Sequence, residues 1–284
     1  MIKSLLYLFC VFGILFCTSC NKEKLKSPQA SFIVVDKAEL SVTPGQGTNS
    51  SNITDIWFYV NGKFQGCYPI GNVMPIVAEN NATIMMYPGI KNNGIAATRQ
   101  PYIFYQAIEL NKDIEAGKTY TVSPVFQYKS GVYFAVNDNF ESSGSQFIPY
   151  AQGDSSYVLT ADPSKTFGGT GKSVFISMSD TKPVSGMQTG STYALPGSGS
   201  NVYLEFNYKC NQKIVVGVIG INGTSSVERN AAVINPSPDW NKIYVQLTSV
   251  ISTQPEYPAY KVFIKAEKGT DVPEIYIDNV KLIY

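Results

Sequence analysis

The chain has 284 residues, and its hydrophobic content of 44% is enough for two domains that each bury a core. Its formal net charge at pH 7 is +1 and it has no basic cluster, which argues against a nucleic-acid partner. The absence of histidine excludes catalytic triads built on imidazole, imidazole general bases and the common zinc sites. Carboxylate pairs of the glycosidase type remain open, together with Ser-Lys and Tyr-based schemes.

The N-terminal segment has the layout of an export signal. Lys3 supplies a positive start, residues 5–16 form an apolar run that is short for a bilayer span, and a segment that ends in Cys20 follows. This pattern resembles the signal and lipobox of bacterial lipoproteins. The resemblance implies that residues 1–19 are removed and that Cys20 carries a lipid anchor in the outer membrane, on its periplasmic or cell-surface face. An uncleaved anchor helix and an ordinary secretory signal are the alternatives. Residues 20–30 are polar and predict a short tether.

Only two cysteines, Cys67 and Cys210, lie beyond this N-terminal segment. They fall in different expected domains, so we expect two free thiols that pack as small hydrophobic groups rather than a disulfide. Their separation also fits no metal-binding spacing.

Residues 31–130 show the alternation of an all-β domain. The runs 56–60 and 63–68 flank Asn61-Gly62, a dipeptide that favours positive φ at both turn positions and therefore predicts a hairpin. Residues 55–66 resemble a hairpin of small immunoglobulin-like and PEGA-type envelope modules, which implies an immunoglobulin-like β-sandwich over residues 31–130. Further strands are expected over residues 83–87, 102–108 and 119–127.

Three features have both a structural and a functional interpretation. The irregular stretch 89–99 is either a binding loop that presents Arg99 or a solvated connection between sheets. Trp57 and Tyr59 lie opposite the aliphatic face of their expected strand, so they are candidate binding residues unless a second sheet covers them. Trp240 could form a binding platform, but we expect it to pack in a core.

Residues 137–284 are expected to form a second domain of some eight strands, the last over residues 274–284. Several short segments, in this order, resemble carbohydrate-binding modules with a galactose-binding-like jelly roll. They are Phe140-Glu141, Gly171-Lys172-Ser173, Leu204 to Tyr208, Trp240-Asn241-Lys242 with Leu247, and Tyr276 to Val280. The resemblance implies a jelly roll whose partner is a polysaccharide or oligosaccharide.

Members of that family often hold a structural calcium between an opening Glu and a closing Asp. The resemblance makes Glu141 and Asp278 candidate ligands, together with carbonyl oxygens of residues 168–172. Calcium takes six to eight oxygen ligands, and such a set of carboxylates and carbonyls can supply them. The alternative is that both carboxylates cap strand ends by bonding to the backbone.

Glycan binding needs flat aromatic faces against sugar C–H groups, and amides or carboxylates that pair with hydroxyls. In the expected strands 202–208 and 260–265, aliphatic residues alternate with polar and aromatic ones. If the aliphatic set is buried, the other set faces solvent on one sheet. The predicted binding residues are Tyr203, Glu205, Asn207, Tyr244, Gln246 and Phe263. The alternative is an ordinary solvated sheet face.

Taken together, the sequence predicts an all-β protein with an immunoglobulin-like sandwich followed by a jelly roll. The favoured hypothesis is a lipid-anchored, non-catalytic envelope protein that binds a glycan through its jelly roll. The first alternative is a structural lipoprotein that docks another envelope protein and binds no sugar. A glycosidase or peptidoglycan-active enzyme ranks third, because no carboxylate pair stands out in the sequence.

Overall fold

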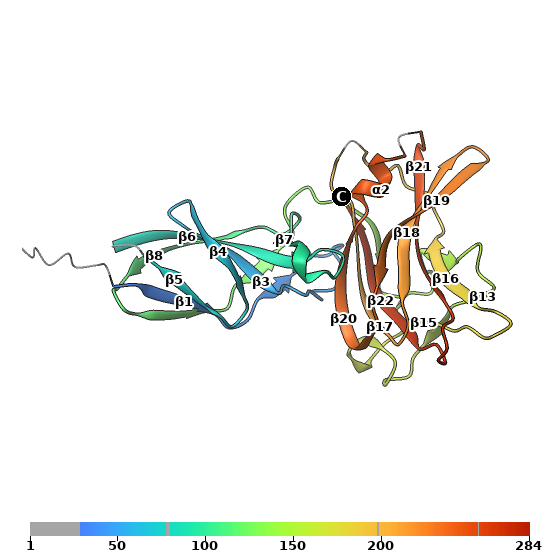
Figure 1. Ribbon diagram of the computed structural model, residues 1–284, viewed down its shortest axis with the longest axis horizontal. Helices are drawn as coiled ribbons and strands as arrows, with labels where there is room; N and C mark the ends of the chain where they lie inside the picture. Colours follow the sequence, from blue (N-terminus) through green and yellow to red (C-terminus); the bar gives the residue numbers. More distant parts are fainter. Residues whose placement is uncertain (1–28, 78–79, 198, 255) are drawn as a thin grey trace, which may run out of the picture.

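The computed structural model describes residues 29–77, 80–197, 199–254 and 256–284. The expected signal peptide and Cys20 lie outside these residues. Within them the regular structure is almost entirely β. The chain forms two β-sandwich domains that lie end to end along the long axis of the molecule (Figure 1). The predicted all-β class with two sandwiches is therefore confirmed. No helix in the described part of the chain is long and apolar enough to span a membrane.

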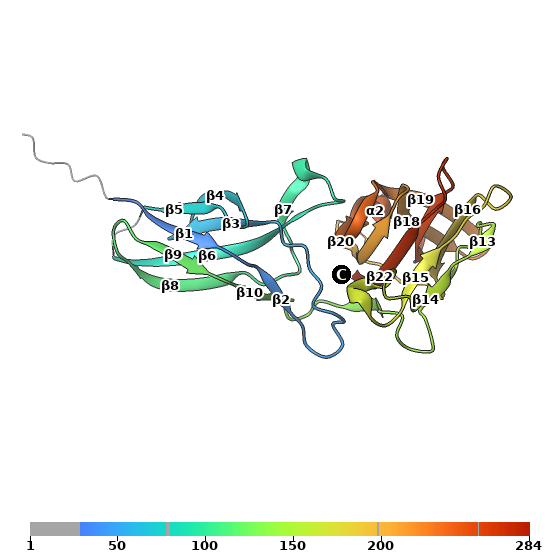
Figure 2. The same cartoon turned by 90° about the horizontal axis from the view of Figure 1, so that it is seen from below.

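The first domain contains β1 to β10, which enclose one apolar core (Figure 2). One sheet has the order β4-β3-β6-β7, with β8 also paired to β6, and the strands β5-β1-β9 and β10-β2 form two smaller sheets. The strands are β1 (Ser31–Val35), β2 (Glu39–Ser41), β3 (Asp55–Val60), β4 (Lys63–Pro69), β5 (Val73–Ile76), β6 (Asn80–Lys91), β7 (Arg99–Pro101), β8 (Ile108–Ile114), β9 (Thr119–Val122) and β10 (Val125–Gln127), with a short 3-10 helix η1 (Ala96–Thr98) before β7.

The hairpin predicted at Asn61-Gly62 is confirmed. Both residues have positive φ, 49° and 75°, and β3 and β4 pair antiparallel on either side of them. The expected aliphatic face of β3 is also confirmed, because Ile56, Phe58 and Val60 are buried in the core of the first domain. Alternation with period two therefore predicted both the turn and the orientation of this strand.

The stretch 89–99 contains a turn and a short 3-10 helix between two paired strands. β6 runs on to Lys91, and after η1 the chain returns as β7 beside it. This pairing requires a residue without a side chain at Gly89, because the carboxylate of Asp55 occupies the space that a Cβ atom would need. Arg99 does not serve a binding loop here: its Nε lies 3.3 Å from Oδ2 of the buried Asp55.

The expected strand over residues 102–108 is wrong. Only β8, which begins at Ile108, is a strand, and the residues before it form a turn. This turn carries Tyr102, Phe104 and Tyr105, all of which are buried. Its aromatic residues mimic a strand pattern, but they pack against the second domain instead of a neighbouring strand.

The second domain contains β11 to β22 in two facing sheets. One sheet has the order β14-β15-β22-β17-β20 with β11 also paired to β22, and the other has the order β12-β16-β21-β18-β19 with β13 also paired to β16. The elements are β11 (Phe134–Asp138), β12 (Phe147–Pro149), β13 (Ser155–Ser156), β14 (Val158–Thr160), η2 (Phe167–Gly169), β15 (Ser173–Ile176), β16 (Val184–Thr189), β17 (Tyr203–Cys210), β18 (Ile214–Asn222), β19 (Ser225–Ile234), β20 (Ser237–Gln246), α2 (Thr248–Ser252), β21 (Ala259–Glu267) and β22 (Ile275–Ile283).

The last expected strand is β22, and it lies at the centre of its sheet. It pairs with β11 and β15 on one side and with β17 on the other, and all nine of its residues are buried. The inward side chains of both sheets form one apolar core. Within the described part of the chain, Cys67 and Cys210 are both free cysteines.

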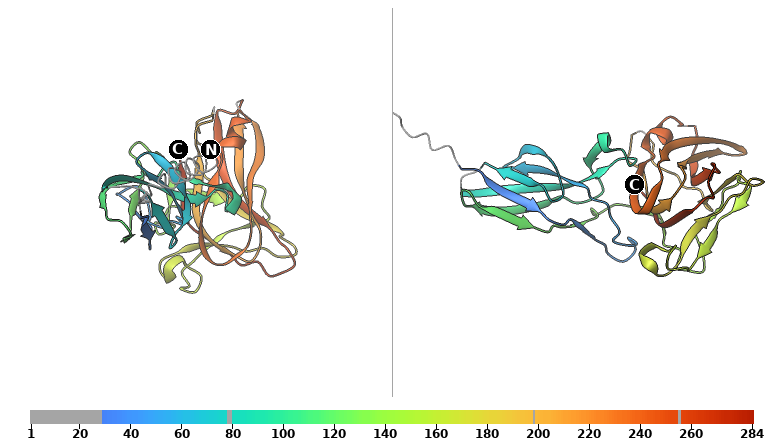
Figure 3. Two further views of the ribbon diagram at one scale, coloured as in Figure 1. Left: turned by 60° about the vertical axis from the view of Figure 1, so that its left-hand side comes forward. Right: turned by 60° about the horizontal axis from the view of Figure 1, so that its bottom comes forward.

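The core of the first domain continues across the domain boundary. Tyr203, Tyr244 and Ile283, from the outer face of the β22 sheet, belong to it. The turn after β6 also extends this sheet, because Asn92 forms a parallel bridge with Tyr244 and the N–H of Asn93 donates to the Tyr244 carbonyl at 2.9 Å. The two domains therefore pack together through a shared apolar cluster (Figure 3).

Candidate functional site

The sheet face predicted to bind a glycan is not open to solvent. Tyr203, Glu205 and Tyr244 do share the outer face of the β22 sheet, but their exposed fractions are only 1%, 0% and 1%. The aromatic turn of the first domain covers them, with the Tyr102 and Tyr203 ring centroids 5.2 Å apart. The expectation of solvent exposure is therefore wrong for these three residues, because a neighbouring domain occupies the space that a ligand would need.

The other three predicted residues have different surroundings. Asn207 is buried on the same face, and Phe263 is fully buried on β21, which belongs to the opposite sheet. The prediction that Phe263 shares a sheet with Tyr203 is wrong, because β21 pairs with β16 and β18. Gln246 alone stays partly exposed, and it lies at the junction of the two domains.

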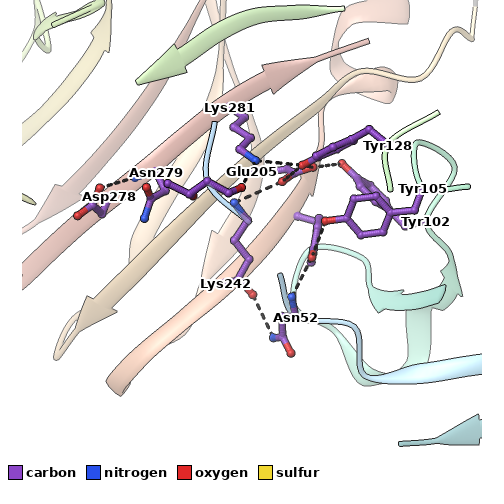
Figure 4. Close-up of polar contacts among 11 residues, drawn as sticks. Asn52, Tyr102, Tyr105, Tyr128, Glu205, Lys242, Asp278, Asn279 and Lys281 are labelled. Carbon is purple, nitrogen blue, oxygen red and sulfur yellow. Dashed lines mark hydrogen bonds and ion pairs between the residues drawn. The ribbon is translucent and has the colours of Figure 1, made fainter. Parts of the chain in front are cut away.

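A buried polar network centred on Glu205 joins the domains (Figure 4). The hydroxyl of Tyr102 donates to Oε1 of Glu205 at 2.7 Å, and the hydroxyl of Tyr128 lies 3.0 and 3.1 Å from its two oxygens. Lys242 forms an ion pair with the same carboxylate, with Nζ 3.3 Å from Oε2. Glu205 thus serves as a structural acceptor, because protein donors already surround its carboxylate.

Lys281 approaches the network from β22. Its Nζ donates to the Thr48 carbonyl at 2.7 Å and to the Tyr128 hydroxyl at 3.3 Å. Burial lowers the pKa of Lys281 to about 8, although the charge of Glu205 opposes this shift. Burial likewise lowers the pKa of Lys242 and raises the pKa of Tyr102 and Tyr128 well above its usual value. These shifts follow from the burial of the whole network at the domain boundary.

Beside this network, the domains enclose an open cleft with a volume of about 490 Å³. The first domain supplies most of its wall, and β17, β20 and Asn201, two residues before β17, supply the rest. The lining residues are Tyr59, Tyr87, Gln100, Pro101, Tyr102, Ile103, Tyr105, Lys129, Asn201, Tyr203 and Gln246. Five tyrosines and three side-chain amides thus converge on one space.

Several contacts fix the polar rim of the cleft. The amide Nε2 of Gln100 donates to the Tyr203 hydroxyl at 2.6 Å. The backbone N–H of Gln246 donates to Oδ1 of Asn93 at 2.8 Å. The side-chain Oε1 of Gln246 accepts a hydrogen bond from Nδ2 of Asn92 at 3.3 Å. Among the described residues that line this cleft, none carries a carboxylate. Its chemistry is that of neutral hydrogen-bonding groups and aromatic faces, with Lys129 as the one cation.

An aromatic surface continues from the cleft along the first domain. Trp57 and Tyr59 are partly exposed on the outer face of β3, as the alternation predicted. The ring of Tyr59 lies 5.4 Å from Tyr87 and 5.1 Å from Phe64, and Phe64 stacks on Trp57 at 5.5 Å. We call Trp57, Tyr59, Phe64 and Tyr87 the aromatic surface.

The expected calcium ligands border one loop of the second domain. Oε1 of Glu141 accepts the N–H of Lys172 at 2.8 Å, and Oδ2 of Asp278 accepts the Ser173 hydroxyl at 2.5 Å. Thr166, in the same loop, has a buried Oγ1 that finds no hydrogen-bond partner among the residues the structure describes. Burial, with smaller contributions from nearby carboxylates, raises the pKa of Asp278 to about 6.

These two carboxylates and the unpaired hydroxyl fit part of a calcium site. Among the described residues, no group of three or more acidic or cysteine side chains is arranged to hold a metal ion. Backbone carbonyls, hydroxyls and water would have to supply the remaining oxygens. The role of Glu141 and Asp278 in calcium binding stays a prediction.

Comparison with protein-family models finds no match, and neither does comparison with curated proteins. Among solved structures, the enzymatically active domain of tailspike protein 4 from bacteriophage CBA120 is 14% identical with a TM-score of 0.36, over 51% of this chain and 20% of that chain. The carbohydrate-binding and catalytic modules of Clostridium thermocellum xylanase 10B, complexed with xylohexaose, are 14% identical with a TM-score of 0.39, over 53% and 28%. A family 29 carbohydrate-binding module complexed with cellulohexaose is 14% identical with a TM-score of 0.36, over 55% and 93%. The match thus spans less than a third of each of the first two proteins.

Much of the cleft was missed at the level of sequence. Tyr87, Gln100 and Asn201 belong to segments that gave no binding signal, whereas Tyr203 and Gln246 were predicted as binding residues and Tyr59 stood out through its position opposite an aliphatic face. Trp240 was expected in the core, but it lies outside the core cluster and packs edge-on against Phe167, with centroids 5.5 Å apart.

Proposed function

We propose that this protein is a lipid-anchored, non-catalytic cell-envelope protein that binds a glycan in the cleft between its two domains. The cleft itself carries this proposal, because two partly exposed tyrosines, Tyr59 and Tyr87, and three amide side chains from both domains line one open space. Of the residues predicted from the sequence, the partly exposed Gln246 takes part, whereas Tyr203 is buried and supports the rim through its hydrogen bond with Gln100. The proposed site therefore lies at the edge of the sheet face on which the sequence predicted it.

The chemistry of the lining suits a sugar. Aromatic faces pack against the C–H groups of a pyranose ring, and amides pair with its hydroxyls in both directions, as donors and as acceptors. Tyr59 and Tyr87 are partly exposed, as are the amides of Gln100, Asn201 and Gln246. None of the described lining residues carries a carboxylate. The lining therefore also favours binding over hydrolysis, because hydrolysis needs an acid and a base or nucleophile beside the scissile bond.

The shared core makes the cleft a preformed site. Tyr203 and Tyr244 pack within the core of the first domain, and Asn93 holds Gln246 through its backbone. A ligand therefore meets two walls that are already fixed, so little conformational entropy is lost on binding.

A glycan array tests the proposal. The soluble chain 21–284 would be applied to printed plant, fungal and bacterial polysaccharides, and the hits measured by titration calorimetry. We expect Tyr87→Ala and Asn201→Ala to weaken binding about tenfold or more, since each removes a lining side chain. Tyr133→Ala is the matched control, because Tyr133 is 58% exposed and lies outside the cleft. An array without any hit, or cleft variants that bind as well as the wild type, would refute glycan binding.

One observation favours the structural alternative. β14 is the edge strand of its sheet, and its Val158 and Leu159 are 52% and 42% exposed. An exposed apolar edge is a place where another envelope protein could add a strand. The same array decides here, because a folded chain that binds no glycan leaves this alternative as the better account.

The anchor is tested separately. Labelled palmitate should enter the wild-type chain in cells and should not enter Cys20→Ser. Protease added to intact cells then distinguishes the cell-surface face of the outer membrane from the periplasmic face. Labelling of Cys20→Ser at the wild-type level would contradict lipidation at this cysteine.

A further inference from the structure

We infer that the ligand is a linear polysaccharide whose chain leaves the cleft across the aromatic surface of the first domain. This inference rests on the proposed glycan binding and adds the ligand's form: an extended chain rather than a terminal sugar. Its basis is continuity, because Tyr59 and Tyr87 line the cleft and also begin the aromatic surface.

The spacing of the rings suits successive sugars. From the cleft outward, Tyr87 and Tyr59 have centroids 5.4 Å apart, and Tyr59 and Phe64 have centroids 5.1 Å apart. Each step is comparable to one sugar unit of an extended chain. The two-residue turn at Asn61-Gly62 sets this arrangement, since Val60 pairs with Lys63 and Phe64 therefore stands directly opposite Tyr59.

The fold does not need these rings for its core. The buried face of β3 is complete with other residues, whereas Phe64 is 50% exposed and Trp57 and Tyr59 are partly exposed. Exposed aromatic rings are a cost to the free protein that a ligand packing against them can offset.

The aromatic surface is also uncharged. Its four side chains carry no ionised group, and the cleft lining adds only Lys129. A neutral sugar chain therefore meets matching chemistry along the whole path. A pocket for a single terminal sugar would instead be closed at one end, whereas this cleft opens onto Tyr59 and Tyr87.

Oligosaccharides of increasing length provide the test. A ladder from disaccharide to octasaccharide would be prepared by partial acid hydrolysis of the polysaccharide that binds best on the array. We expect the affinity of the wild-type chain to rise with length. Phe64→Ala should weaken binding of the hexasaccharide about tenfold and leave the disaccharide within about twofold, because only the longer chain reaches Phe64.

Three further variants keep the test decisive. Phe64→Tyr retains an aromatic ring and should bind the hexasaccharide as the wild type does, whereas Tyr133→Ala removes an equally exposed ring elsewhere and should change nothing. In Trp240→Phe, Trp57 is the only tryptophan left, so its fluorescence should change with the hexasaccharide and not with the disaccharide.

Two results would overturn the inference. The first is an affinity that does not depend on the length of the oligosaccharide. The second is a Phe64→Ala variant that loses as much affinity for the disaccharide as for the hexasaccharide. If Tyr87→Ala abolishes binding while length has no effect, the cleft stands and only the extended path fails. If no polysaccharide binds at all, the proposed function fails and this inference fails with it.

Discussion

Tyr102 of the first domain donates a hydrogen bond to Glu205 of the second across 2.7 Å, and both side chains are buried. The two residues are 103 positions apart in the chain. Because the carboxylate has left water, it depends on such donors for compensation. The domain boundary is thus held by a polar contact that is costly to leave unmade, in addition to the shared apolar core.

Tyr102→Phe should destabilise the protein. The substitution keeps the ring packing but removes a donor from a buried carboxylate, so we expect the free energy of unfolding to fall by about 1–3 kcal/mol. Denaturant titration measures this loss. Tyr133→Phe serves as the control and should change the free energy by less than about 0.5 kcal/mol, since its side chain is exposed. Equal stabilities of the two variants would show that Tyr128 and Lys242 satisfy Glu205 without Tyr102.

Stability should rise with pH above about 8 because of Lys281. Its pKa is lowered from 10.5 to about 8 by burial, so between pH 8 and 10 the unfolded chain binds a proton that the folded chain has released. The free energy of unfolding therefore increases with pH in this window, by about 2 kcal/mol from this group. Above pH 10 the trend reverses, because the pKa of Tyr102 and Tyr128 is raised by burial and the unfolded state ionises first.

Lys281→Met isolates that contribution. From pH 7.5 through 8.5 to 9.5, the free energy of unfolding should rise more steeply in the wild type than in Lys281→Met. Lys63→Met removes an exposed lysine and should follow the wild-type slope. A slope that is the same in all three proteins would mean that Lys281 keeps an ordinary pKa.

The two domains should unfold in one transition. Each domain contains one tryptophan, Trp57 in the first and Trp240 in the second, so Trp240→Phe and Trp57→Phe report on the domains separately. Because Tyr203 and Tyr244 complete the core of the first domain, neither domain keeps its buried surface after the other unfolds. The fluorescence midpoints in guanidinium chloride should coincide. Midpoints that remain separated, after correction for the effect of each substitution, would show that the domains are independent.

Calcium should stabilise the chain if Glu141 and Asp278 hold it. At a concentration one hundred times the dissociation constant, binding to the folded state alone adds about 2.7 kcal/mol, and the melting temperature rises accordingly. Asp278→Asn should lose this response. Asp162→Asn removes an exposed carboxylate that precedes the same loop and should retain it. A wild-type melting temperature that responds neither to calcium nor to chelator would count against the site.

The sequence predicted which residues share a face better than it predicted what covers that face. Alternation correctly placed Tyr203 and Glu205 opposite the buried Leu204, because side chains alternate along any strand. It could not show that the face is covered, because the covering turn at Tyr102 lies about a hundred residues away. That turn also has a strand-like composition, which led to a wrong local assignment.

The cleft was hidden for a related reason. Its residues come from several strands and from both domains, and no two walls are close in sequence. The available signals were the alternation that placed Tyr59 opposite an aliphatic face and the alternation that placed Tyr203 and Gln246 on one sheet face. Phe263 shows a second limit of sequence periodicity. The periodicity identifies which residues share a face of a strand, but not the sheet to which that strand belongs.

The central position of β22 has a consequence for biogenesis. This strand is among the last parts of the described chain to be synthesised, yet it separates β15 from β17 and contributes Ile283 to the core of the first domain. Neither domain can therefore complete its native packing while the ribosome is still adding β22, and closure depends on slow, long-range pairing. Until β22 has been synthesised, the chain remains incompletely packed and exposes apolar surface that the native state buries.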